Sequence, residues 1–240
     1  MRLDKYLCEA GVGTRSEVKR LIAKGLVTVD GSAVRDSGIK LDEQTASVAV
    51  DGRPVCYAAF EYYMLNKPAG VISASRADLR RQEERCVVDL IETRLRKDLF
   101  PVGRLDKDTE GLLLITNDGA LAHRLLAPKK HVDKTYFVRL SGALSEEARQ
   151  TLEQGVDIGD EKPTLPCRLC QAAAEAERKD WLITIQEGRF HQIKRMAQAV
   201  GLEVVYLKRL SMGSLQLDPA LAPGSYRPLT AEELKNLQQN

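Results

Sequence analysis

Apolar segments of two kinds alternate along this chain without the regular spacing of strand–helix–strand repeats, and this pattern constrains the fold most. Segments 112–115 and 181–185 suit buried strands, whereas the apolar residues within 193–200 recur at helical intervals. This order of elements predicts an α+β fold with a mixed, largely antiparallel sheet rather than a doubly wound parallel one. A chain of 240 residues also has room for a small domain beside a larger one.

The first 58 residues predict a small unit of two short helices followed by hairpins. Thr14 and Glu17 form a capping-box pattern before the second helix, and Asp30-Gly31 suits a tight hairpin turn. Residues 1–40 hold eight basic and five acidic side chains and so have a net charge of +3. The remaining residues have a net charge of −1, which gives +2 for the whole chain. Such a charge distribution favours contact with phosphates, although charged helix faces are commonly only solvated. The candidate phosphate-binding residues are Arg2, Lys5, Arg15, Lys19, Arg20 and Lys24.

The sequence lacks the motifs of several common classes of enzyme. The sequence has no GxxxxGK[ST], GxGxxG, HExxH or GxSxG pattern, which disfavours the common nucleotide, zinc-protease and serine-hydrolase sites. Cys167 and Cys170 form a CxxC pair without a second pair or well-spaced histidines, so we expect free thiols and no metal. No apolar run approaches the roughly 20 residues of a membrane helix, and no signal peptide is evident. We therefore expect no membrane contact, and a cytoplasmic location.

The run GRLDKDTEGLLLITNDG, residues 103–119, places a carboxylate between a turn-rich stretch and a buried strand. Asp106 can act there as a nucleophile or base if a cation keeps it ionised, but an aspartate in such a loop commonly only caps a turn. Asp106 and Asp108 also invite comparison with a glycosidase pair. We expect these two carboxylates to point to opposite sides, which disfavours that alternative.

The same run closely resembles the signature of the RsuA/RluB/RluE/RluF family of pseudouridine synthases. Three further matches follow the order of that family: LNKPxG at 65–70, KTY at 134–136 and EGRFHQIKRM at 187–196. Residues 1–58 resemble the S4 (αL-type) RNA-binding domain. The motif at 187–196, in the form EGRFHQIKRM, and PGxYRPL at 223–229 are most similar to the sequences of the RsuA branch. That branch acts on small-subunit ribosomal RNA.

The resemblance implies a role for each site residue and requires no cofactor. Asp106 is the expected catalytic aspartate, Tyr136 is expected to pack on the flipped base and assist proton transfer, and Lys194 is expected to pair with Asp106. A base must leave the stack before such chemistry, and Arg104 would fill the gap that it leaves. The remaining candidates for substrate binding, at the pocket wall, at its rim or on phosphate, are Leu207, Lys67, Arg189 and His191.

The expected reaction is isomerisation of one uridine in ribosomal RNA, most specifically uridine-516 of 16S RNA, by a monomer acting on a small-subunit assembly intermediate. Two alternatives stay open: the same reaction on 23S RNA, and a non-catalytic S4-containing protein for RNA binding or ribosome assembly. The predicted organisation is an S4 domain at 1–58, a linker at 59–62, a catalytic domain at 63–232 and a C-terminal tail at 233–240.

Overall fold

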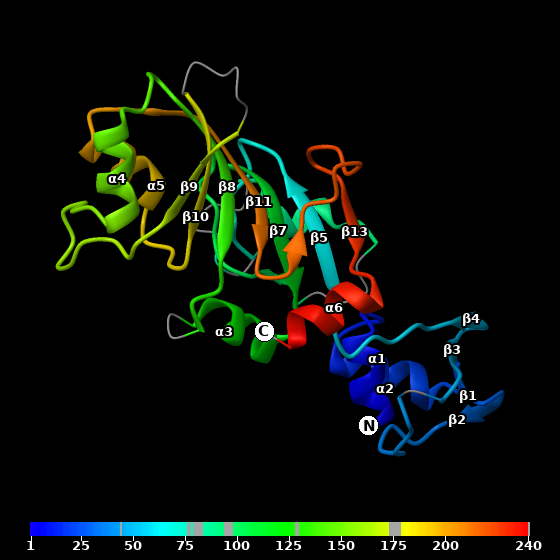
Figure 1. Ribbon diagram of the computed structural model, residues 1–240. Coiled ribbons are helices and arrows are strands. Elements are labelled where there is room, and N and C mark those ends of the chain that lie inside the picture. The colour runs from blue at the N-terminus through cyan, green and yellow to red at the C-terminus, as the bar shows by residue number, and fades with distance from the viewer. Residues whose placement is uncertain are drawn as a thin grey trace. The chain divides into compact units, whose positions relative to one another are not determined.

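A computed structural model describes residues 1–43, 45–75, 78, 84–93, 98–127, 130–172 and 179–239. The chain divides into two compact units (Figure 1). The first comprises Met1–Glu61 with Glu92–Leu99, and the second comprises Tyr62–Ile91 with Phe100–Asn240. The predicted domain limits differ from this division by a few residues and by the segment Glu92–Leu99, which the sequence did not place in the first unit.

The first unit consists of two helices and a small antiparallel sheet in the order β2-β1-β3-β4. Its elements are α1 (Leu3–Glu9), α2 (Arg15–Ala23), β1 (Val27–Val29), β2 (Ser32–Val34), β3 (Val48–Val50) and β4 (Arg53–Pro54). The predicted capping box at Thr14 begins α2, and Asp30-Gly31 joins β1 to β2 with positive φ at both residues. Buried Leu3, Leu7 and Ile22 lie in the core of this unit.

The second unit is built on a nine-stranded sheet whose main path is β13-β5-β7-β11-β8-β10-β9. Among these neighbours only β7 and β11 run parallel, so the predicted mixed, largely antiparallel α+β fold is confirmed. The strands are β5 (Tyr62–Lys67), β6 (Phe100–Pro101), β7 (Glu110–Thr116), β8 (Lys134–Leu140), β9 (Arg168–Gln171), β10 (Asp180–Ile185), β11 (Val204–Met212), β12 (Leu215–Gln216) and β13 (Tyr226–Pro228).

Helices pack on two parts of this sheet. They are α3 (Gly119–Leu126), α4 (Glu146–Gln154), α5 (Gln192–Ala199) and α6 (Ala231–Gln238), with a short 3-10 helix, η2, at Val87–Leu90. Helices α4 and α5 lie beside β9 and β10, whereas α3 and α6 lie near the end of the strands (Figure 1). Leu121 of α3 and Leu237 of α6 share a buried cluster with Met64 and Leu112. The predicted tail at 233–240 is therefore wrong over 233–238, which belong to a packed helix.

Gly111 permits the parallel contact between β7 and β11. Its φ is +99°, and a Cβ added there would lie 2.2 Å from the backbone oxygen of Arg209. Only glycine tolerates both the conformation and the contact. This contact matters for the site because β7 follows the loop that holds Asp106, and β11 supplies Leu207.

No helix in the described part of the chain is long and apolar enough to span a membrane.

Candidate active site

A pocket in the second unit brings together residues from five segments of the chain. The loop before β7, strands β8, β10 and β11, and the loop that leads into α5 all contribute to its wall. The lining residues are Arg104, Leu105, Asp106, Thr109, Tyr136, Ile185, Gly188, Arg189, His191, Gln192, Ile193, Lys194 and Leu207. The structure thus gathers all the catalytic and substrate-binding candidates except Lys67 around one cavity.

A buried lysine holds the turn that carries Asp106. Lys67 is fully buried at the end of β5, and its Nζ donates hydrogen bonds to the backbone oxygens of Pro68, Lys107 and Thr109 at 3.1, 3.2 and 2.8 Å. The Thr109 amide closes the turn by donating to the Asp106 backbone oxygen. The prediction that Lys67 lies at the rim or contacts phosphate is therefore wrong. Burial lowers the pKa of Lys67 to about 8, despite the nearby carboxylates.

Lys194 of α5 lies between two carboxylates. Its Nζ is 2.7 Å from both oxygens of Asp108 and 3.4 Å from Asp106 Oδ2. The expectation that Asp106 and Asp108 point to opposite sides is wrong, because both carboxylates lie beside one ammonium, and side chains two positions apart share a face even on a strand. The hydrogen bond from Lys194 lowers the pKa of Asp108. Burial opposes the charge on Lys194, but its bond to Asp108 and the two carboxylates raise its pKa overall, so it stays protonated at neutral pH.

The loop that leads into α5 forms another part of the wall. His191 adopts a left-handed conformation with φ of 49°, and its Nε2 lies 3.6 Å from Asp106 Oδ1. Arg189 lies in the wall, but its guanidinium binds Glu187, Asp160 and two backbone oxygens, those at 162 and 163. Phosphate contact by Arg189 would require breaking these bonds, and the side chain instead fixes the loop.

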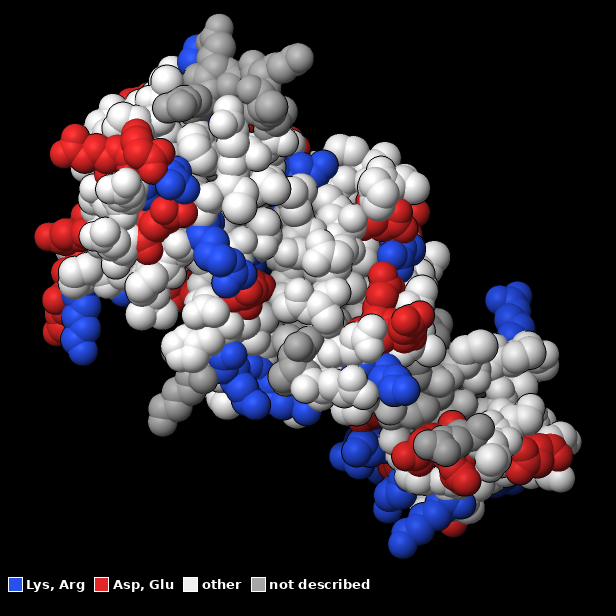
Figure 2. Space-filling view, viewed as in Figure 1, with Lys and Arg blue, Asp and Glu red and all other residues white. Residues whose placement is uncertain are grey.

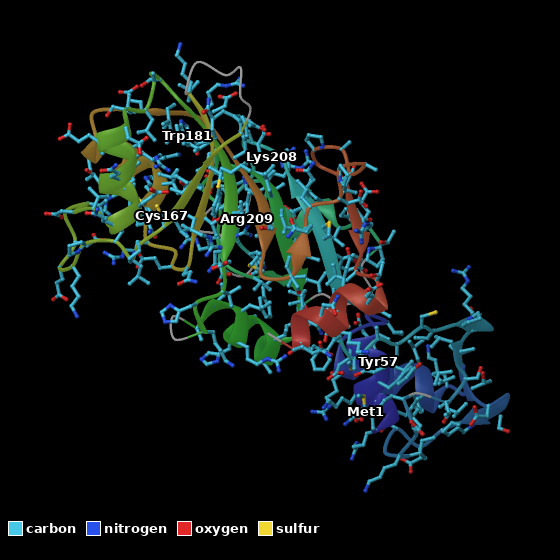
Figure 3. All side chains as sticks on the ribbon, viewed as in Figure 1. Met1, Tyr57, Cys167, Trp181, Lys208 and Arg209 are labelled. Carbon is cyan, nitrogen blue, oxygen red and sulfur yellow. The ribbon has the colours of Figure 1, made fainter. Side chains whose placement is uncertain are left out.

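Three other predicted residues line the pocket from separate elements. Tyr136 of β8 is 7% exposed, and Leu207 of β11 is equally buried. Arg104 is exposed at the mouth. Arg209 also lies on β11 (Figure 3). It pairs in register with Tyr136, is 2% exposed and donates from Nε to the Leu112 backbone oxygen.

Sequence reasoning assigned no role to two buried polar residues of the wall. The Thr109 hydroxyl is buried and has no hydrogen-bond partner in the described part of the structure. Gln192 Oε1 accepts from the Arg189 amide, and its Nε2 donates to Glu187. Both residues lie within motifs that match the family, at 103–119 and 187–196, and this is the one feature of the sequence that could have indicated a place in the site. Their burial depends on distant strands and could not be read from the sequence.

The basic candidates of the first unit lie on its surface, and Figure 2 shows Lys and Arg side chains exposed on this unit. Arg2 forms a bidentate ion pair with the buried carboxylate of Asp4, and this hydrogen bonding lowers the pKa of Asp4. Arg15 lies 3.8 Å from the same carboxylate. Lys5 pairs with Glu9 at 3.7 Å. The other three candidates, Lys19, Arg20 and Lys24, are exposed on or just after α2.

The five cysteines are free. Cys167 is buried, with its thiol against the Leu152 backbone oxygen, and burial raises its pKa to about 12, whereas Cys170 is exposed. Within the described residues, no group of three or more histidine, cysteine or acidic side chains is arranged to hold a metal ion.

Comparison with known proteins matches both units. The RNA pseudouridylate synthase family model matches residues 61–199, and the S4 domain model matches residues 1–45. The chain is 52% identical over 240 residues to an uncharacterized RNA pseudouridine synthase, YtzG, of Bacillus subtilis, and the match covers 100% of this chain and 99% of the relative. It is 40% identical to ribosomal small subunit pseudouridine synthase A of Vibrio cholerae, with 99% of both chains covered.

One solved structure agrees over nearly the whole chain. A crystal structure of a pseudouridylate synthase has a TM-score of 0.68 with this chain at 33% identity, and the match covers 99% of each chain. The fold and the site therefore define an enzyme that isomerises uridine in RNA. The chain belongs to the RNA pseudouridylate synthase family, within the RsuA-like group, and has an N-terminal S4 domain.

Proposed function

We propose that this enzyme converts one uridine of small-subunit ribosomal RNA to pseudouridine, with Asp106 as the essential carboxylate. The observation that carries the proposal is the convergence of Asp106, Tyr136 and Lys194 on one pocket from distant segments. Relatives named for the ribosomal small subunit support the substrate, and uridine-516 of 16S RNA is the specific target that we propose. We further propose that the enzyme acts in the cytoplasm as a monomer on an assembly intermediate.

The proposed mechanism assigns the chemistry to three side chains. The uridine leaves its stack and enters the pocket, where Asp106 acts on it as nucleophile or base while the C1′–N1 bond breaks and the ring rejoins through C5. Lys194 places its ammonium 3.4 Å from Asp106 Oδ2, where its positive charge attracts the carboxylate and helps to hold it in place. Tyr136 packs on the uracil and assists the transfer of the C5 proton.

Other residues of the wall would bind and orient the nucleotide. Leu207 provides an apolar surface beside Tyr136, and Arg104 would occupy the space that the extruded uridine leaves in the RNA. The Thr109 hydroxyl has no hydrogen-bond partner among the described residues, lines the pocket and would gain from a hydrogen bond to a polar group of the substrate. His191 is close enough to Asp106 to contribute to its electrostatic environment.

The first unit would bring RNA to this pocket. Its exposed basic side chains are suited to phosphates, and contacts of this kind recognise the shape of folded RNA rather than base edges. Arg2 and Arg15 share a buried carboxylate, so we expect them to contribute less than fully unpaired cations. We propose the limits 1–58 for this RNA-binding domain.

The test is a pseudouridine map of ribosomal RNA from cells with and without the protein, together with in vitro reactions on transcribed RNA and on assembly intermediates. The proposal predicts loss of one pseudouridine in small-subunit RNA and its restoration by the purified protein. Loss of a pseudouridine in large-subunit RNA would move the target to 23S RNA. A protein that binds RNA but forms no pseudouridine on any of these substrates would be a non-catalytic binding or assembly factor.

A further inference from the structure

Phe190 presents an aromatic ring to solvent beside the pocket. It is 75% exposed, more than any other large apolar side chain in the described part of the chain, where the next are Val205 at 64% and Phe60 at 52%. A ring this exposed contributes little to the core of the second unit. Because it stands one residue from the pocket wall, this exposed ring is placed to pack against a molecule bound there.

The ring is held in place. It stacks on the imidazole of His191, with ring centroids 3.8 Å apart and planes inclined by 19°. The Phe190 backbone oxygen accepts a hydrogen bond from Arg195, and Arg189 before it is bound by four acceptors. An aromatic ring on so fixed a loop loses little conformational entropy when a second ring packs against it.

The stack leads directly to the reactive carboxylate. His191 lines the pocket, and its Nε2 lies 3.6 Å from Asp106 Oδ1. Phe190 is thus the outer layer of a two-ring stack whose inner ring faces Asp106. A nucleotide adjacent in the chain to a uridine in this pocket would come close to the outer layer.

We propose that Phe190, supported by His191, is a stacking platform for the base of a nucleotide next to the target uridine. This inference rests on the proposed function. When a base is extruded from RNA its neighbour loses a stacking partner, and an exposed aromatic ring at the mouth of the pocket replaces it. Cationic Arg104 and Lys194 lie in the same pocket wall, a setting that suits a nucleotide with its phosphate better than an apolar peptide.

The first experiment measures binding without turnover. In an Asp106→Asn background, Phe190→Leu is expected to raise the dissociation constant for a short RNA oligonucleotide spanning the mapped uridine about tenfold, whereas Phe190→Trp keeps wild-type affinity. Phe60→Leu, the same change at another exposed phenylalanine, serves as the matched control and is expected to have no effect. A dissociation constant for Phe190→Leu within twofold of the control would overturn the proposal.

A second readout separates stacking from support of His191. Trp181 is the one tryptophan of the chain and is 6% exposed, so fluorescence from Phe190→Trp reports on position 190 over a constant background. Stacking predicts quenching of this added fluorescence when the oligonucleotide binds. No quenching, or a fall in kcat for Phe190→Leu with binding unchanged, would instead show that Phe190 only positions His191.

The two hypotheses fail in different ways. If wild-type protein forms no pseudouridine in ribosomal RNA, the proposed function fails before Phe190 is tested. If the wild type is active and Phe190→Leu matches it in KM, kcat and binding, only the stacking platform fails.

Discussion

Replacing Lys67 by methionine removes three hydrogen bonds from beneath the turn that carries Asp106. Bonds to a charged group contribute about 1.5–3 kcal/mol each. Against them stands the burial of the ammonium, whose pKa falls from its usual 10.5 to about 8, equivalent to about 3 kcal/mol. We expect Lys67→Met to lose about 2–5 kcal/mol of stability, because the buried Thr109 carbonyl and the part-buried Pro68 carbonyl lose this donor, while the Lys107 carbonyl keeps only the bond from the Gly70 amide.

The assay combines thermal unfolding with single-turnover pseudouridine formation. A loss of 2 kcal/mol lowers the melting temperature of a unit of this size by roughly 4–8 °C. The turn then relaxes around Asp106, and a displacement of about 1 Å commonly costs on the order of 100-fold in rate. Lys107→Met, in the same turn but exposed, is the matched control and is expected to change neither quantity. Wild-type values of both for Lys67→Met would refute the structural role.

The same lysine predicts a pH dependence of stability. Between about pH 8 and pH 10 the buried amine of Lys67 loses its proton, whereas in the unfolded chain it remains protonated. The unfolded state then binds more protons, so the free energy of unfolding rises with pH over this window. The stability difference between wild type and Lys67→Met should therefore widen from pH 8 upward, and a constant difference in chemical denaturation would contradict the assigned burial.

Three further changes probe other parts of the molecule. Gly111→Ala should prevent folding of the second unit or reduce its soluble yield, because its Cβ would lie 2.2 Å from the Arg209 backbone oxygen, and circular dichroism of a well-folded variant would contradict this. Lys194→Met should reduce kcat on the order of 100-fold while Lys194→Arg retains part of it, since the positive charge beside Asp106 is what matters; equal rates for the two variants would oppose this. Deletion of residues 1–58 should weaken RNA binding and flatten its salt dependence, and an unchanged slope would exclude phosphate contacts there.

Local features of the fold could be predicted because neighbouring residues determine them. The capping box at Thr14 and Glu17 and the turn at Asp30-Gly31 form as the sequence indicates. Each depends on contacts within a few residues, where side-chain chemistry restricts the backbone directly.

Features that depend on distant contacts were predicted only through family resemblance or were missed. Lys194 contacts Asp108 across 86 positions of sequence, and no periodicity reports such a contact. In the sequence, Lys67 is indistinguishable from an ordinary cation at the end of a strand. Its burial depends on the turn at 106–109, which packs over it. Leu237 belongs to a core whose other buried members lie more than 20 positions away, so the sequence around it does not predict a packed helix.

We propose that Asp106 performs the reaction and that the other residues of the pocket position this carboxylate and the uridine. The most direct measurement compares wild type with Asp106→Asn on the same transcribed small-subunit RNA, by mapping pseudouridine and measuring binding in parallel. We expect one pseudouridine with the wild type, none with Asp106→Asn, and nearly equal RNA affinity, because the substitution keeps the size of the side chain. Appreciable pseudouridine formation by Asp106→Asn would contradict it.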